Sequence, residues 1–123
     1  MLVADDSPTV RQAICRVLEG DSDIQVIGQA VDFSSAVRLA NELNPQVLVL
    51  DLRMPDIHKF DSMSFRSQLP SGCRLIAISI WDDEETKRLA EQLGADSFLE
   101  KMELGTEIIP AIKSQVNEHK RTI

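Results

Sequence analysis

The chain has 123 residues, of which 43% are hydrophobic and 27% are charged, a composition typical of one globular domain with a single core. Its 13 basic and 20 acidic side chains leave a formal net charge of -7. This charge repels nucleic-acid phosphates and anionic membranes, so we expect no direct nucleic-acid binding. No apolar run is long enough for a membrane span, and charged residues occupy the first 20 positions. We therefore expect a cytoplasmic protein without membrane contact.

Short apolar segments alternate with segments of helical periodicity, which predicts successive strand-helix units. Segments 47–50 and 75–80 are almost continuously apolar, so we expect helices on both of their faces, as in a parallel sheet. With right-handed crossovers and a central first strand, the common order of five such strands is 2-1-3-4-5, a doubly wound, flavodoxin-like α/β fold. The predicted strands are 2–4, 25–30, 47–50, 75–80 and 97–99.

Apolar residues at spacings of three and four predict the intervening helices. The first helix has Ser7 as its N-cap and Pro8 at its first position, and it ends before Gly20. A weaker pattern predicts a helix at 59–68. A second helix is predicted from an apolar stripe at 36–43 and ends before Pro45. A further helix lies between a capping box at Asp82 and a terminating Gly94, and the last helix covers 104–118.

Polar side chains follow the strands at the edge of the sheet where ligands bind in such folds, near the switch point between the first and third strands. Asp5 and Asp6 follow the first strand and Asp51 follows the third, while Ser79 and Lys101 end the fourth and fifth. Each residue alone has an ordinary explanation as a cap, a turn residue or a surface charge. Together they would place three carboxylates, a hydroxyl and an ammonium in one crevice.

Three carboxylates in one crevice repel one another unless a cation or a substrate group lies between them. Asp5 and Asp6 opposite Asp51 supply hard oxygen ligands suited to Mg²⁺, which commonly bridges to phosphate. A carboxylate can act as a nucleophile toward phosphorus, and Asp51 is the best candidate because its strand lies next to the switch point. Lys101 would neutralise phosphoryl oxygens, and Ser79 would donate a hydrogen bond to them.

At these positions the chain resembles the receiver domain of two-component response regulators. The resemblance spans essentially the whole chain and rests on VADDSP, VLVLDLRMP, LIAIS and FLEK, in this order. It implies that residues 1–123 form one receiver domain, with a longer chain carrying a C-terminal output domain left open. The implied partner is a sensor histidine kinase or a histidine phosphotransfer protein, and a homodimer also stays open.

The resemblance assigns a role to each site residue. Asp51 accepts the phosphoryl group in a Mg²⁺-dependent transfer. Asp6, Asp51 and the backbone carbonyl of Arg53 ligate the ion, and Asp5 holds it through water. The phosphoryl group is contacted by Ser79 and Lys101, and the implied switch residues are Ser79 and Phe98. For Phe98, burial in the core is an equally good explanation.

Three departures from the family pattern affect this interpretation. Met102 replaces the usual proline in a cis peptide, and a cis bond before another residue costs about 3 kcal/mol. Residues 56–61 contain no glycine. Ile80 and Trp81 follow Ser79 where the family has a very small residue, so Ile80 is predicted to be an access gate that narrows the path to Asp51. The alternative places Ile80 in the core between its strand and helix.

The sequence leaves other functions open. The leading interpretation is a phosphorylation-controlled signalling switch that relays its state to a partner or an output domain. The alternative is a pseudo-receiver, an interaction module that keeps the fold but is never phosphorylated. A turnover enzyme such as a phosphatase is disfavoured because Arg53 stands where that chemistry needs a second acid. The basic run at 119–121 is consistent with a linker to a following domain.

Overall fold

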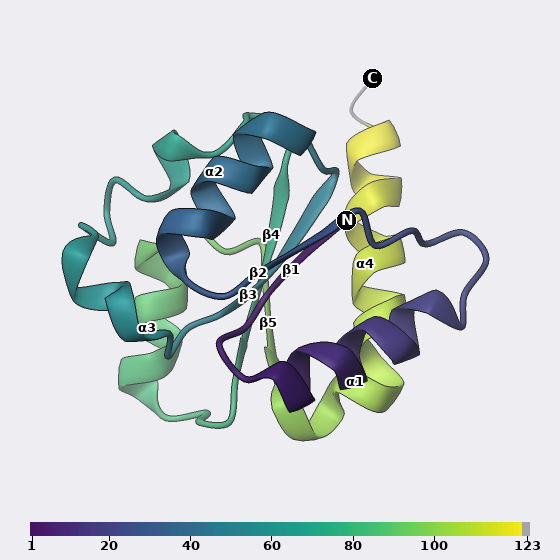
Figure 1. The fold of residues 1–123 in the computed structure, drawn as a ribbon, viewed down its shortest axis with the longest axis horizontal. Coiled ribbons are helices and arrows are strands. Elements are labelled where there is room, and N and C mark those ends of the chain that lie inside the picture. The colour runs from purple at the N-terminus through teal and green to yellow at the C-terminus, as the bar shows by residue number, and fades with distance from the viewer. Residues whose placement is uncertain (122–123) are drawn as a thin grey trace.

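The computed structural model describes the backbone of residues 1–121 and the side chains of residues 1–116, so the side chains of the basic run at 119–121 lie outside it. It contains a parallel sheet in the order β2-β1-β3-β4-β5, which confirms the predicted doubly wound fold (Figure 1). Within the described part, no helix is both long and apolar enough to cross a membrane. The strands are β1 (Leu2–Ala4), β2 (Gly28–Ala30), β3 (Val47–Asp51), β4 (Arg74–Ser79) and β5 (Ser97–Glu100).

Helices cover both faces of the sheet (Figure 1). On one face lie α1 (Pro8–Glu19) and α4 (Leu104–Arg121), and on the other lie α2 (Phe33–Leu43) and α3 (Glu84–Gln92). In β3, Leu48 and Leu50 face the α2 and α3 side, while Val47 and Val49 face the α1 and α4 side. This double coverage is the reason that β3 is apolar at successive positions.

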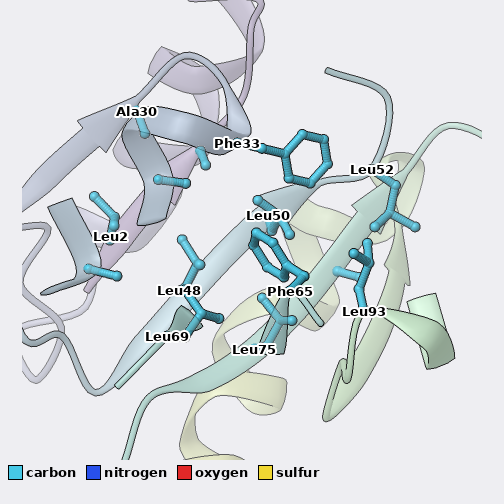
Figure 2. Packing of buried hydrophobic residues seen from close by; sticks show 14 of the residues in the cluster. Leu2, Ala30, Phe33, Leu48, Leu50, Leu52, Phe65, Leu69, Leu75 and Leu93 are labelled. Atoms are coloured by element: carbon cyan, nitrogen blue, oxygen red, sulfur yellow. The ribbon is translucent and has the colours of Figure 1, made fainter. Parts of the chain in front are cut away.

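The core beneath α2 and α3 is built around aromatic rings (Figure 2). Phe33, at the start of α2, packs edge-on against Phe65 with ring centroids 5.6 Å apart. The ring of Phe60 lies 5.9 Å from Phe33 and 6.1 Å from Phe65. These contacts attach the segment after β3 to the sheet, and leucines of the strands and loops surround them: Leu48, Leu50, Leu52, Leu69, Leu75 and Leu93.

The predicted helix at 59–68 is wrong. The segment forms two short 3-10 helices, η1 (Pro55–Lys59) and η2 (Arg66–Gln68), joined by turns. Local side chains compete with helical hydrogen bonding, because Asp61 accepts a bond from the Met63 amide at 3.1 Å and Ser64 donates to the Asp61 carbonyl at 3.1 Å. The rings of Phe60 and Phe65, five positions apart, both pack against Phe33.

Several element boundaries also differ from the prediction. β2 is shorter than 25–30 because its ladder begins only at Gly28, opposite Leu2. β4 ends at Ser79, whose partner Glu100 ends β5, so Ile80 lies outside the strand. The cap of α3 is Asp83, which accepts the Thr86 amide at 2.8 Å, and not Asp82.

The glycine-free loop after β3 is fastened to α2 by one carboxylate. Asp56 is buried, and its two oxygens accept the amides of Phe33 at 2.8 Å and Ser34 at 3.0 Å. These amides belong to the first turn of α2, whose donors have no partner within the helix. Asp56 therefore satisfies the end of a helix that precedes it in the chain by more than 20 positions.

We expect Asp56→Ala to lower the free energy of unfolding by about 1–3 kcal/mol, because one buried and one part-buried amide lose their acceptor. Urea unfolding measures this change. The matched control is Asp61→Ala, which removes a carboxylate that accepts one exposed amide and should cost less than about 1 kcal/mol. Equal losses in the two variants would contradict the anchoring role of Asp56.

Candidate functional site

Three carboxylates meet at the carboxyl edge of the sheet, as the strand order predicts. Asp5 and Asp6 follow β1, and Asp51 is the last residue of β3. One oxygen of each lies within 4.8 Å of the others. Asp5 is fully buried and Asp51 is 2% exposed, whereas Asp6 is open to solvent. The cluster thus has two buried members and one at its mouth.

Lys101 supplies the positive charge that faces the buried carboxylates. Its Nζ lies 2.9 Å from Oδ2 of Asp5 and 3.4 Å from Oδ2 of Asp51. The lysine reaches both although Met102 follows it and no peptide bond among the described residues is cis. The missing proline therefore does not prevent Lys101 from reaching the cluster.

The second oxygen of each buried carboxylate binds its own turn. Oδ1 of Asp5 accepts the Ser7 amide at 2.9 Å, and Oδ1 of Asp51 accepts the Arg53 amide at 3.1 Å. The ordinary explanation of these aspartates as turn residues is therefore correct for one oxygen of each. The turn bonds fix the direction of the carboxylates, which leaves the Oδ2 atoms to face Lys101.

Burial and the proximity of like charges make Asp51 a weak acid. Burial, followed by the charge of Asp5, raises the pKa of Asp51 from 3.8 to about 6, although the Arg53 amide and Lys101 oppose this shift. Burial would lower the pKa of Lys101, but the facing carboxylates outweigh it and raise that pKa above 10.5. One ammonium does not balance the negative charge of the three carboxylates, so the site favours additional positive charge.

Ser79 lies on the strand next to that of Asp51. It follows Ile78, which pairs with Asp51 in the sheet, and it is fully buried. Its Oγ accepts the Trp81 amide at 3.1 Å. A hydroxyl accepts and donates at once, so this bond leaves the Ser79 proton for a ligand in the crevice.

The structure separates the two interpretations of Ile80. The side chain is 62% exposed, so its placement in the core between β4 and its helix is wrong. Trp81 and Met102 are exposed as well, at 54% and 91%. Phe98 is half-buried and packs against the core cluster beneath α2 and α3, as the core explanation of this residue expects.

The sequence did not indicate that the side chains of two arginines, Arg11 and Arg53, support the site. Arg11, on α1, donates to the Asp5 carbonyl at 2.9 Å and to Gln29 of β2 at 2.9 Å. The Arg53 side chain donates to Oγ1 of Thr86 in α3 at 2.8 Å. Only the position of Arg11 on the polar face of a predicted helix hinted at its role, and no local pattern links Arg53 to a residue 33 positions away.

The donor set suits a small divalent cation. Oδ2 of Asp5 is buried and, among the described residues, accepts no well-aligned hydrogen bond; its contact is the ion pair with Lys101. Together with Asp51 and Asp6 it offers oxygen ligands alone, which is the chemistry that Mg²⁺ prefers. A cavity of about 720 Å³ lies at the opposite end of the strands, near Met1 and Ile112, and none of the predicted site residues lines it.

Comparison with known proteins agrees with this geometry. Residues 1–113 match the family described as response regulator receiver domain. The transcriptional regulatory protein LiaR of Bacillus subtilis is 33% identical over 114 residues, which are 93% of this chain and 54% of LiaR. The nitrate/nitrite response regulator NarL of Escherichia coli K12 is 29% identical over 99 residues, 80% of this chain and 46% of NarL. The chain thus spans about half the length of each relative.

Solved structures show the same arrangement. The signal receiver domain of the response regulator NarL from Mycobacterium tuberculosis superposes with a TM-score of 0.73 at 29% identity, covering 91% of this chain and 94% of that one. The response regulator domain of Thermotoga maritima CheB gives 0.80 at 24% identity, with 94% of each chain covered, and supports the fold alone.

The raised pKa of Asp51 predicts a pH-dependent effect of Asp51→Asn on metal-free stability. The folded state binds the Asp51 proton more tightly than the unfolded state does. The protonated carboxyl therefore makes its full contribution to the free energy of unfolding below pH 3.8, and this contribution is lost as the pH rises through about 6. Asn resembles the uncharged form and should stabilise the protein by about 1–3 kcal/mol at pH 8.

This gain should shrink toward zero as the pH falls below 5. Urea unfolding with a chelator present measures it, and Asp61→Asn in the exposed loop is the control. A gain that stays constant with pH would show that the carboxylate charge is not its cause.

Proposed function

Because the chain belongs to the response regulator receiver family of two-component signalling, we propose that it is a phosphorylation-controlled switch whose acceptor is Asp51. The observation that carries this proposal is the position of Asp51. Its carboxylate is buried at the end of a central strand, within 3.4 Å of the Lys101 ammonium and beside two further carboxylates. Such a site combines a nucleophile, a fixed cation and a place for a second cation.

The proposed step is an in-line transfer from a phosphohistidine. An oxygen of the Asp51 carboxylate attacks phosphorus, an oxygen–phosphorus bond forms, and the phosphorus–nitrogen bond breaks. The electron pair of that bond stays on the imidazole of the donor. Lys101 neutralises a phosphoryl oxygen, and the Ser79 hydroxyl, oriented by the Trp81 amide, donates a hydrogen bond to another.

The residues that would hold Mg²⁺ are Asp6, Asp51 and the Arg53 carbonyl, with Asp5 acting through water. When bound, the ion would neutralise charge on the phosphoryl oxygens. The chain itself orients its ligands through turn bonds: the Arg53 amide holds Asp51 and the Ser7 amide holds Asp5. Lys101 balances part of the remaining negative charge.

The output of the switch follows from the strand pairing. Ser79 pairs with Glu100, and Phe98 lies opposite Ala77, so β4 and β5 move together. A phosphoryl group that draws Ser79 and Lys101 toward Asp51 would therefore displace the ends of both strands. The half-buried Phe98 on β5 would change its packing in response, which alters the surface presented to a partner.

Two other functions are less well supported. A pseudo-receiver would not need Lys101 within reach of both buried carboxylates, although the exposed Ile80 and Met102 depart from the family pattern. A phosphatase would need a second acid near Asp51, and the Arg53 side chain at that position binds Thr86 instead. We therefore assign a switch that promotes its own phosphorylation and is not a turnover enzyme.

The proposal also covers the partners. The phosphodonor is a sensor histidine kinase or a histidine phosphotransfer protein in the cytoplasm. Residues 1–123 act as one receiver domain. Because LiaR and NarL are about twice as long as the matched region, we propose that the complete protein carries a C-terminal output domain. That domain would provide any DNA contact. The proposal also includes a homodimer as an arrangement of the active form.

We expect the protein to gain the mass of one phosphoryl group when it is incubated with a small phosphodonor and Mg²⁺, because Asp51 faces both Lys101 and the metal ligands. Intact mass spectrometry measures the gain. Asp51→Asn should abolish it, whereas Asp61→Asn should leave it unchanged. The same gain in Asp51→Asn would move the acceptor elsewhere, and no gain in the unaltered protein would favour the pseudo-receiver.

Ile80→Ala tests the proposed access gate. Since the side chain is exposed next to Ser79, its removal should speed both phosphorylation by small donors and hydrolysis of the aspartyl phosphate, each by about twofold to tenfold, because both need in-line approach. Rates of phosphate gain and loss measure the effect. Met63→Ala removes an exposed apolar side chain in the loop after β3 and should change neither rate. Unchanged rates in Ile80→Ala would remove the gate.

A further inference from the structure

Arg53 connects the acceptor strand to a helix through its side chain. Its backbone amide binds Oδ1 of Asp51 at 3.1 Å, and its guanidinium donates to Oγ1 of Thr86 at 2.8 Å. Just before it, the Leu52 amide binds the Ile78 carbonyl at 3.1 Å, which continues the pairing of β3 with β4. The bond from Arg53 to Thr86 therefore bridges the two segments beyond the end of the paired strands.

Thr86 is placed to receive this bond. It lies in the first turn of α3 and is the one buried residue in the otherwise exposed run 80–88. Its amide donates to the Asp83 carboxylate at 2.8 Å, and hydrogen bonding by Thr86 lowers the pKa of Asp83, with a smaller contribution from the charge of Arg53. The Thr86 hydroxyl accepts a hydrogen bond from Arg53, and its proton stays available for the Asp83 carboxylate.

The Arg53 guanidinium binds α3 and not the carboxylate cluster. Arg53 follows Asp51 by two positions, and Asp51 belongs to a cluster of three carboxylates whose mutual repulsion favours added positive charge. Its guanidinium nevertheless donates a hydrogen bond to a neutral hydroxyl on α3. The Asp83 and Thr86 pair supplies both charge and hydrogen bonding there, so the arginine acts as a link to α3, and Lys101 remains the cation that faces the buried carboxylates.

We propose that Arg53 is a positioning residue, whose bond to Thr86 holds the main chain at 51–53 in place for metal binding and phosphoryl transfer and couples α3 to the metal site. The inference rests on the proposed function, because the Arg53 carbonyl is one of the assigned Mg²⁺ ligands. Loss of the bond frees that carbonyl to move away from the ion. By reciprocity, metal binding at the carbonyl must also stiffen the first turn of α3.

Thr86→Val tests the link without changing charge, because valine keeps the shape of threonine and removes the hydroxyl. We expect Mg²⁺ affinity to fall by about threefold to tenfold, below the roughly 10–100-fold effect of contacts that orient metal-binding side chains, because the Arg53 carbonyl is only one of several ligands. Trp81 fluorescence or an NMR titration with MgCl₂ measures the dissociation constant. Urea unfolding of the metal-free protein shows separately whether Thr86→Val folds and how much stability it loses.

A double-mutant cycle shows whether Thr86 acts through Arg53. In an Arg53→Met background, Thr86→Val should cause no further loss of Mg²⁺ affinity, since the link is already absent. Arg88→Met removes an exposed arginine from the same helix and controls for the loss of positive charge. The unaltered protein should show Mg²⁺-dependent shifts of the Thr86 and Lys87 amides, and Arg53→Met should lose these shifts while keeping those at Asp6.

Each alternative has its own outcome. Lower stability of Thr86→Val with unchanged Mg²⁺ affinity would leave Thr86 a structural residue and overturn the proposal. Tighter Mg²⁺ binding in Thr86→Val would overturn it as well, as would an equal effect of Thr86→Val with and without Arg53. These measurements need no phosphorylation, so failure of the link is distinct from failure of the switch, which would appear as no phosphoryl gain in the unaltered protein.

Discussion

The arrangement of the site depends on one ammonium shared by two buried carboxylates. Lys101 joins β5 to β1 and β3 through Asp5 and Asp51, across the carboxyl edge of the sheet. Two carboxylates can be buried there only because this cation faces them and their turns supply amides. The charge remains incompletely balanced, as the raised pKa of Asp51 shows. The folded chain thus holds electrostatic repulsion at the place where an added cation would relieve it.

Because of this imbalance, a change of charge at the site would act beyond the site itself. A group that adds positive charge, or that replaces the carboxylate charge of Asp51, changes what Lys101 faces. Because Lys101 follows β5 directly and Ser79 ends β4, a change at the site acts first on the two strands that border α3 and α4. The folded state is therefore sensitive to local charge, and a ligand shifts it by its differential affinity.

The sequence predicts the features that repeat along the chain and misses those that depend on single long-range contacts. Apolar runs and helical spacing predicted the five strands and their order, and the strand ends then predicted that three carboxylates and Lys101 gather at one edge of the sheet. The prediction of a helix at 59–68 was wrong because serine and aspartate side chains compete with the helical hydrogen bonds, and because Phe60 and Phe65 pack on Phe33. The anchor at Asp56 and the bond from Arg53 to Thr86 join residues with no shared periodicity.

The anchoring of the loop after β3 also limits how this domain can be recombined with its relatives. Asp56 binds the first amides of α2, and the rings of Phe60 and Phe65 pack on Phe33 of the same turn. The segment 55–69 and the start of α2 must therefore be exchanged together, although β3 separates them in sequence. A chimera that takes this loop from another receiver must take the matching first turn of α2 with it, or leave the amides of Phe33 and Ser34 without their acceptor.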